Sequence, residues 1–580
     1  MDSGHQSFDP TGDIIHSFVS SNLSRIEADF RHVRRQLLAE VFRLKPKGLK
    51  PSKVLPILDA SANAAEELLR EICSHHSIDW WLVAVRRLPV EVAGWPDAWI
   101  AFATIAILKH SSWEDTTQGS IRTDRQHGVV FDATESDMLL ACRLAGAARI
   151  LAETTNLIRW LGKGATVRHL GDGRLKNRAR NDVREAVEAY ERRRPENALF
   201  ADAGIFVGER ARSVEEYSRT PIVALGRPNP PFARLLPSRD AFKLSYFPRL
   251  LDPKRVRAGL IPYDEAIYDI FRIRIEQVAS VLASIGRLML RSIPEGHHPN
   301  PLLFNSETED FAHRFRFMLR LCRKGFVRFP REYLRERIVA AHSTLGHSTS
   351  PSDAESDVDA FFEAFCLVDQ DRRKLEVRTL KWLPLLCQSP SGHCYLDMLW
   401  MEDFLRNLVV RGKQWFSSEH GDRFTIRLKK HLEEKVRGIQ VLGWKTKSID
   451  GENEHPEVDL AVHHQGRLYC IECKAYAKND AFWRGERKAV SDRAARIAKA
   501  VRQARAAGEA IKTLLAEGRL RVPGVRVVEW VVCMPSQEFL KPLSKFGLLE
   551  TGVPRVCTPQ ELILHLRRLS ENAGSVTGGT

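Results

Sequence analysis

The sequence lacks an apolar stretch long enough to cross a bilayer. Its longest apolar run, Ala98 to Leu108, ends at Lys109, whereas a membrane-spanning helix needs about 20 apolar residues. The first residues, Met1 to His5, are polar and do not resemble a secretory leader. We therefore expect a cytoplasmic protein with no membrane partner, in which Ala98 to Leu108 forms a buried helix.

Cysteine is scarce and is not arranged as a set of metal ligands. The ten cysteines are scattered along the chain, and in a cytoplasmic protein they are expected to be reduced. Cys470 and Cys473 have CxxC spacing, but on a strand this odd separation directs the two side chains to opposite faces.

Leu161 to Thr166 has the glycines and lysine of a phosphate loop without its spacing or its preceding strand, so we reject ATP binding there.

Acidic residues are fewer than basic ones. The 580 residues include 88 Lys and Arg against 73 Asp and Glu, which gives a formal charge of +15. Such a charge favours encounter with polyanions, and nucleic acid is the expected partner. The charge predicts encounter and does not predict specificity.

The length predicts several domains. From the N-terminus we expect a mainly helical region at 1–342 with a Pro-rich seam near 221–238, a Ser- and Asp-rich linker at 343–358, a bridging segment at 359–414, an α/β domain at 415–570 and a flexible tail at 571–580. The helical region is a candidate surface for a protein partner, and its tryptophans are read as core in preference to base-stacking side chains. The sequence leaves the function of this region and the oligomeric state open.

A functional argument starts from residues His455 to Ala475. Two apolar, β-branched runs, Val458 to Val462 and Leu468 to Ala475, flank a His-His-Gln-Gly turn. This pattern predicts a β-hairpin.

The predicted hairpin gathers two acids and one amine. Because side chains alternate along a strand, Glu472 and Lys474 share one face, while Ile471 and Cys473 pack on the other. Asp459 is expected on the face of the partner strand that points away from its apolar neighbours Val458 and Leu460. Such an oxygen-rich site suits Mg²⁺, with Mn²⁺ as a substitute, because Mg²⁺ takes one or two carboxylates and completes its octahedron with water and phosphate.

The order Asp459, a spacer, then Glu472-Cys473-Lys474 resembles the catalytic signature of the PD-(D/E)xK, or restriction-endonuclease-like, nuclease superfamily. The spelling Glu457-Val458-Asp459 followed by Tyr469 to Lys474 is most similar to its nuclease-related-domain and Mrr-like branches. The resemblance covers only the last third of the chain, roughly 415 to 570. It implies a core of helix, three-stranded meander, helix, strand and helix (α-β-β-β-α-β-α) around a mixed sheet.

The C-terminal sequence can be read in that order. The expected elements are a helix with an apolar stripe from Phe424 to Val436, a strand at Ile439 to Ile449, the hairpin, a long helix with a stripe from Val490 to Leu515, a buried strand at Val525 to Cys533, and a closing helix that begins with a capping box at Thr558 to Glu561. The other face of the long helix is basic, and Arg487 and Lys488 at its start are candidate contacts to nucleic acid.

The resemblance implies roles for the hairpin residues. Asp459, Glu472 and the backbone carbonyl of Cys473 would hold the metal. Lys474 would orient or deprotonate the attacking water, or stabilise the transition state, and the sequence does not decide among these roles. The alternative is an exposed hairpin on which Glu472 and Lys474 merely pair in solvent.

An additional acid is common on the first helix of the family. Its preferred Gly-x-x-Phe-Glu is spelled Gly421 to Thr425 here, with Thr in place of Glu. Asp422 and Glu433 are candidate substitutes, and Glu457 is a candidate accessory ligand. Catalysis with one metal or with two therefore stays open.

Two functional classes follow. The first is a metal-dependent nuclease, an endonuclease or exonuclease acting on DNA, which by family analogy serves restriction, anti-phage defence or repair. The second is a catalytically silent nucleic-acid-binding or scaffold protein built on the same fold. The intact set of Asp459, Glu472 and Lys474 favours the first class.

Overall fold

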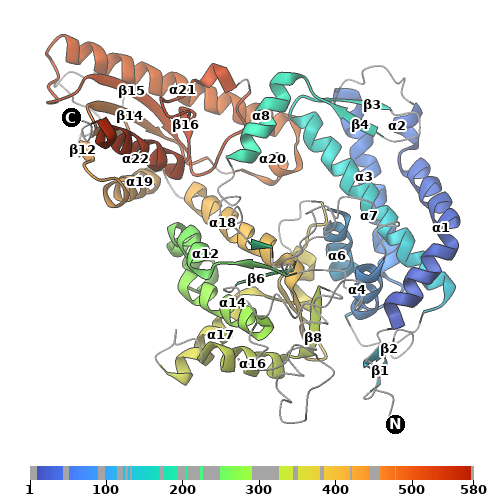
Figure 1. Cartoon of the computed structure of the whole chain (residues 1–580). Helices are drawn as coiled ribbons and strands as arrows, with labels where there is room; N and C mark the ends of the chain where they lie inside the picture. The colour runs from blue at the N-terminus through green and yellow to red at the C-terminus, as the bar shows by residue number, and fades with distance from the viewer. Residues whose placement is uncertain are drawn as a thin grey trace. The chain divides into compact units, whose positions relative to one another are not determined.

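The computed structural model of the chain (Figure 1) describes residues 10–43, 51–88, 98–113, 122–124, 128–130, 133–169, 175–193, 204–205, 222–225, 248–290, 325–343, 350–378, 384–418, 421–442, 458–476, 478–541 and 543–576. These residues form two compact units. The first contains Met1–Ile158, His169–Leu175 and Ala198–Val409, and the second contains Arg159–Arg168, Lys176–Asn197 and Val410–Thr580. Within the described ranges, no helix is both long and apolar enough to cross a membrane.

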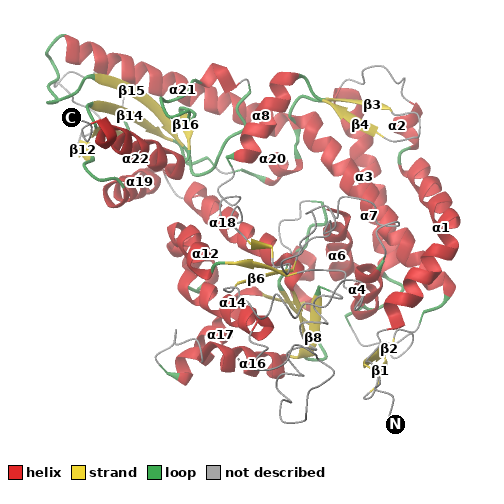
Figure 2. Ribbon diagram, in the orientation of Figure 1, coloured by secondary structure: helices red, strands yellow, loops and turns green. Residues whose placement is uncertain are grey.

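The first unit is mainly helical, as predicted (Figure 2). Its N-terminal helices are α1 (Pro10–Leu37), α2 (Ala39–Arg43), α3 (Pro51–Cys73), α4 (Ile78–Arg87), α6 (Ala98–His110) and α7 (Glu135–Gly162), beside a ribbon of β1 (Arg122–Asp124) and β2 (Gly128–Val130). The apolar run from Ala98 to Leu108 forms the buried helix α6. Trp80, Trp81 and Trp99 are at most 2% exposed, which confirms core packing for these three tryptophans.

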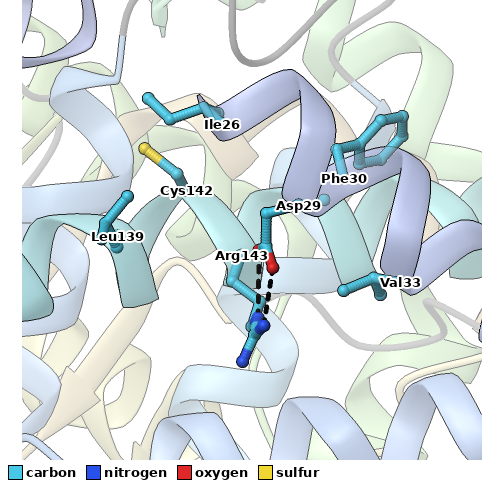
Figure 3. Close-up of a pocket in the computed structure, with 8 residues that line it drawn as sticks. Ile26, Asp29, Phe30, Val33, Leu139, Cys142 and Arg143 are labelled. Atoms are coloured by element: carbon cyan, nitrogen blue, oxygen red, sulfur yellow. Dashed lines mark hydrogen bonds and ion pairs between the residues drawn. The ribbon is translucent and has the colours of Figure 1, made fainter. Parts of the chain in front are cut away.

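A small cavity lies between α1 and α7 (Figure 3). Ile26 and Phe30 contribute to its apolar wall, while Arg143 donates two hydrogen bonds to the carboxylate of Asp29, at 2.6 and 3.1 Å. A Cβ on Gly146 would lie 2.7 Å from the Phe30 ring, so this glycine allows the close approach of the helices. Because its charged groups satisfy each other, we regard the cavity as a packing feature of the helix pair.

The remainder of the first unit mixes helices with two small sheets. One sheet has the order β5 (Gly204–Ile205), β7 (Pro248–Leu251), β6 (Ile222–Leu225), and the other has the order β8 (Phe326–Pro330), β11 (His393–Asp397), β10 (Leu386–Gln388), β9 (Cys366–Val368). The helices are α12 (Pro253–Leu260), α13 (Asp264–Phe271), α14 (Ile275–Leu290), α16 (Arg331–Ser343) and α17 (Pro351–Phe365), and α18 (Met401–Ser418) runs on into the second unit. The predicted bridging segment at 359–414 therefore belongs to the first unit as far as Val409.

Two predicted boundaries in this unit are wrong. The linker expected at 343–358 contains the first half of α17, because Ser350 caps this helix by accepting a hydrogen bond from the Asp353 N–H, and Ala354 and Val358 are buried. Residues 344–349 lie outside the described residues. The seam expected near 221–238 contains β6 and does not divide the units, because both sides of it belong to the first unit. Residues 226–238 lie outside the described residues.

The second unit is built on a five-stranded mixed sheet. Its strands lie in the order β12 (Gln440–Leu442), β13 (Leu460–His464), β14 (Arg467–Cys473), β15 (Val527–Cys533), β16 (Val556–Cys557). The first three form an antiparallel meander, and β14, β15 and β16 run parallel. The helices are α19 (Gly421–Lys435), α20 (Asp480–Arg484), α21 (Arg487–Ala516) and α22 (Pro559–Val576). The predicted order of helix, three strands, helix, strand and helix is therefore present, with α20 and β16 added.

Helices cover both faces of this sheet (Figure 1). On one face, the stripe of α19 predicted from Phe424 to Val436 joins Leu562 and Leu566 of α22 in a single core with alternate strand residues. On the other face, α21 packs on the remaining strand residues, among them Leu468 and Cys470. Helix α22 extends to Val576, so the tail expected at 571–580 is helical in its first part, and 577–580 lie outside the described residues.

A segment from the N-terminal half of the chain completes the second unit. It comprises the end of α7, the ribbon β3 (Thr166–His169) with β4 (Leu175–Arg178), and α8 (Asn181–Arg192). Arg193 donates to the carboxylate of Glu561 at 2.7 and 3.1 Å and to the carbonyl of Val556 at 2.8 Å. A Cβ on Gly162 would fall 1.8 Å from the Gly485 carbonyl oxygen. The boundary predicted at 415 therefore omits an integral part of this unit.

Candidate active site

The predicted hairpin is present and its register is defined. Strands β13 and β14 pair from Leu460 with Ile471 to His464 with Arg467. The two residues between them have positive φ angles, 50° at Gln465 and 73° at Gly466, as a two-residue type I′ turn requires. One step beyond the Leu460–Ile471 pair, the same register sets Asp459 across from Glu472.

The structure brings the three predicted site residues together at the end of this hairpin. The Lys474 Nζ atom lies 2.5 Å from Glu472 Oε1 and 3.9 Å from Asp459 Oδ2. Asp459 Oδ2 also accepts a hydrogen bond from the Cys473 N–H at 2.7 Å, and the Lys474 N–H donates to the Cys533 carbonyl at 3.0 Å. The two residues that follow Glu472 are thus fixed through their backbone to neighbours on either side of β14.

The face of β14 that carries Glu472 is buried, contrary to our expectation. The Glu472 side chain is only 6% exposed, whereas those of Asp459 and Lys474 are each 23% exposed. Helix α21 covers this face and packs on Leu468 and Cys470. The alternative of an ion pair in solvent is therefore wrong for Glu472, because this side chain is buried. A buried carboxylate is costly without a neighbouring cation, and Lys474 provides one.

The chain bends where β13 begins, so one detail of the predicted alternation is also wrong. Val458 packs in the core beneath α21, and Leu460 packs in the core on the opposite face with Ile471. The two neighbours of Asp459 therefore do not share a face. The bend directs the Asp459 carboxylate toward the end of β14, where it meets the Cys473 N–H.

Lys474 is held in its charged form. Burial alone would lower the pKa of Lys474, but the hydrogen bond and negative charge of Glu472, together with the charge of Asp459, outweigh it and raise the pKa above its ordinary value. In this arrangement Lys474 is a cation between two carboxylates.

Cys473 offers its carbonyl to the site and not its thiol. The thiol is buried against α19, where it hydrogen-bonds Thr425, and burial raises the pKa of Cys473 far above its ordinary value, so it is an unreactive thiol. The N–H and C=O of one strand residue point to the same side of the strand. Because the Cys473 N–H points to Asp459, its carbonyl also lies on the Asp459 side.

These donors fit a hard divalent cation. Both carboxylates already lie within 4.0 Å of the same positively charged atom, Lys474 Nζ. In the part of the chain that the structure describes, no group of three or more His, Cys, Asp or Glu side chains is arranged to hold a metal. A metal at this site would therefore have only three ligands from the protein, namely two carboxylates and one carbonyl. Mg²⁺ can bind with so few protein ligands because it keeps several waters, whereas Ca²⁺ takes six to eight oxygen ligands.

Of the three candidate accessory acids, the structure describes the side chain of Glu433 alone. Glu433 is on α19 but exposed, and it makes no hydrogen bond or ion pair with the described residues. Asp422 lies in the first turn of α19, but its side chain is outside the described structure, as is the whole of Glu457. Thr425, the residue at the family's acidic position, contacts Cys473, so α19 approaches the site without a carboxylate there.

The two candidate nucleic-acid contacts, Arg487 and Lys488, lie in the first turn of α21. Both side chains are exposed. Gln503, farther along the same helix, is also exposed and is therefore a surface residue.

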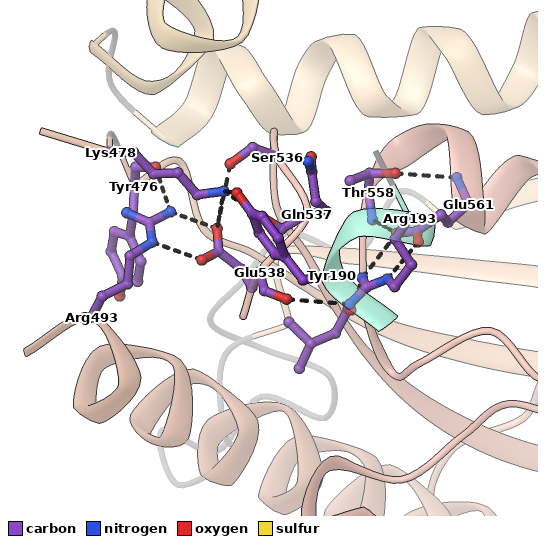
Figure 4. Close-up of polar contacts among 11 residues, drawn as sticks. Tyr190, Arg193, Tyr476, Lys478, Arg493, Ser536, Gln537, Glu538, Thr558 and Glu561 are labelled. Carbon is purple, nitrogen blue, oxygen red and sulfur yellow. Dashed lines mark hydrogen bonds and ion pairs between the residues drawn. The ribbon is translucent and has the colours of Figure 1, made fainter. Parts of the chain in front are cut away.

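A buried polar cluster beside the site was not predicted (Figure 4). Arg493 of α21 donates to both carboxylate oxygens of Glu538, at 2.6 and 2.7 Å, and to the carbonyl of Tyr476 at 3.0 Å. Lys478 donates to the carbonyl of Gln537, and its Nζ atom lies 4.0 Å from Glu538. The cluster ties the segment that follows Lys474 to the segment that follows β15. No short-range pattern marks it, because its members come from three separate segments.

Comparison with known proteins adds no assignment to this geometry. No family model, no curated protein and no solved structure matches the chain. The functional argument therefore depends on the residues of the site.

Proposed function

We propose that this protein is a metal-dependent nuclease of the PD-(D/E)xK type that hydrolyses phosphodiester bonds, with DNA as its substrate. One observation carries the proposal, namely two carboxylates from neighbouring strands, Asp459 and Glu472, around the ammonium of Lys474 at the end of a hairpin. The order of the elements around that hairpin and the net charge of +15 support it.

Each residue has a role in this proposal. Asp459, Glu472 and the Cys473 carbonyl would hold Mg²⁺, which lowers the pKa of a bound water and neutralises charge on a phosphate. Glu472 is fixed by burial and by its bond to Lys474, so it presents its carboxylate without a search over rotamers. The Lys474 side chain is 23% exposed, and its ammonium would stabilise the negative charge that develops on a phosphate oxygen.

A second function is favoured by the closed Lys474–Glu472 ion pair. In a catalytically silent descendant, this pair would serve only to neutralise a carboxylate that α21 buries. The protein would then bind nucleic acid, or act as a scaffold, without cleaving it. The two functions predict different outcomes in a cleavage experiment.

The experiment measures cleavage of linear, circular and single-stranded DNA by the purified full chain with Mg²⁺, Mn²⁺ or EDTA. We expect metal-dependent cleavage that Asp459→Asn and Lys474→Ala abolish while circular dichroism stays unchanged. Exposed residues elsewhere provide matched controls, and Asp269→Asn and Lys429→Ala should cleave like the wild type. Cleavage that survives both site substitutions would refute the site, and a folded wild type that cleaves nothing would support the silent function.

A further inference from the structure

Helix α21 has one face with no place in the proposed active site. Its buried residues, among them Arg493, Ile497, Ala504 and Ile511, face the sheet and the neighbouring loops. The half of the helix that points away from the sheet carries the basic side chains Lys488, Lys499, Arg502, Arg505 and Lys512, all exposed. We call these five residues the α21 stripe.

The spacing of the α21 stripe makes it a continuous surface. The intervals between its members are 11, 3, 3 and 7 residues. The intervals of 11 and 7 are close to whole numbers of helical turns and those of 3 fall about 60° short of one, so the five side chains lie within an arc of about 140° around the helix. From Lys488 to Lys512 the stripe is about 36 Å long at about 1.5 Å per residue. Two exposed acids, Asp492 and Glu509, interrupt it, and the basic side chains outnumber them.

The charges of the α21 stripe have no partner of opposite charge among the described residues. None of the five side chains makes an ion pair or hydrogen bond with any residue in the described ranges. Basic side chains elsewhere on the surface do pair, such as Arg180 with Asp182 and Arg335 with Asp359. Asp492 and Glu509 also stand within one helical turn of stripe residues without pairing with them. The stripe therefore presents separate cations to solvent.

We propose that the α21 stripe is a binding track for the phosphate backbone of double-stranded nucleic acid. A B-form duplex carries one charge per roughly 1.7 Å of its axis, so a row of cations about 36 Å long matches about one turn of duplex. Contacts of this kind fix position without reading sequence. This inference rests on the proposed nuclease function, because it supplies the surface on which the substrate would lie.

The start of the α21 stripe is close to the candidate active site. Arg493 hydrogen-bonds the carbonyl of Tyr476 at 3.0 Å, and Tyr476 is two residues beyond Lys474. Lys488 precedes Arg493 by five residues, or about one and a half helical turns. Farther along the helix, Gly508 packs against Trp530 in the middle of β15. The helix that carries the track is thus fixed by its opposite face to the segment that follows Lys474 and to β15.

The test measures binding and does not depend on catalysis. The full chain is titrated with a fluorescent duplex of about 30 base pairs in EDTA, over a range of salt concentrations. The stripe variant carries Lys499→Ala, Arg502→Ala and Arg505→Ala, because alanine is the best helix former and keeps α21 intact. We expect affinity for the duplex to fall by roughly tenfold or more, and the slope of log affinity against log salt to become shallower by about 3.

A charge-matched variant separates the track from the general charge of the protein. Lys429→Ala, Lys545→Ala and Arg568→Ala remove three exposed cations from α19, the turn before β16, and α22. This variant should bind the duplex within about twofold of the wild type and keep the salt slope. Equal losses in the two variants would overturn the inference, as would a wild type that does not bind the duplex.

A conservative variant excludes a merely structural effect. Lys499→Arg, Arg502→Lys and Arg505→Lys preserve charge and helix propensity, and duplex affinity should return to within a few-fold of the wild type. Failure of this exchange to restore binding would contradict a phosphate track. A protein that binds through the stripe but cleaves nothing would refute the proposed function alone. A protein that cleaves DNA while all variants bind equally would refute the track alone.

Discussion

Replacing Glu538 by Gln should destabilise the second unit more than removal of a cation from the same cluster. Glu538 is 1% exposed, accepts two hydrogen bonds from Arg493 and lies 4.0 Å from the Lys478 ammonium. The substitution removes the negative charge of this group and leaves two cations, whose side chains are 8% and 3% exposed. Breaking a buried pair in this way costs about 3–5 kcal/mol of unfolding free energy.

The matched substitution is Lys478→Met, which leaves the Arg493–Glu538 pair balanced. It removes a short hydrogen bond to the Gln537 carbonyl and a long one, at 3.4 Å, to the Tyr190 hydroxyl. A hydrogen bond of a charged group is worth about 1.5–3 kcal/mol, and the short bond supplies most of the loss. Because the chain has two units, the unfolding free energy is measured locally, by hydrogen exchange of peptides from α21 and β15 in increasing urea. A Lys478→Met variant that loses as much stability as Glu538→Gln would refute this charge argument.

Two other predictions concern the same unit. His565 is 1% exposed between Tyr469 and Thr551, and burial lowers its pKa from 6.5 to about 4. Because His565 binds a proton more readily in the unfolded chain than in the folded one, the unfolding free energy should fall as pH is lowered from about 6.5 to 4, by up to about 3 kcal/mol. Thermal melts over this pH range should show the loss, and His565→Gln should reduce it. Gly162→Ala should destabilise the unit by more than about 1 kcal/mol, because its Cβ would fall on the Gly485 carbonyl. A neutral effect on urea unfolding would contradict the packing of α7 into this unit.

The sequence predicted the elements of the second unit whose signals are local. The apolar stripe from Phe424 to Val436 repeats every four residues and forms α19. At the start of α22, the Thr558 N–H donates to the Glu561 carboxylate and the Glu561 N–H donates to the Thr558 hydroxyl, which is the predicted capping box. The hairpin was predictable because alternation and a two-residue turn together fix its register.

Features that depend on tertiary contacts were not predictable. Alternation along β14 does not show whether a helix covers its second face, so Glu472 was expected to face solvent. Helix α21, which comes later in the sequence, covers that face. The segment after Ser343 looked like a linker by composition, yet residues 351–358 are helical, with a cap at Ser350 and a buried Val358. Arg193 and Glu561 are 368 residues apart in sequence, and no pattern within either segment predicts that they pair.

The central claim is that Asp459 and Glu472 form a site for a divalent metal, and Mn²⁺ binding followed by electron paramagnetic resonance tests it most directly. The claim predicts Mn²⁺ binding by the full chain that Mg²⁺ displaces, that Asp459→Asn and Glu472→Gln abolish, and that exposed Asp492→Asn leaves intact. Lys474→Ala should bind Mn²⁺ more tightly than the wild type, because it removes the cation that lies between the carboxylates. Binding that is unchanged in Asp459→Asn and Glu472→Gln would contradict the metal site.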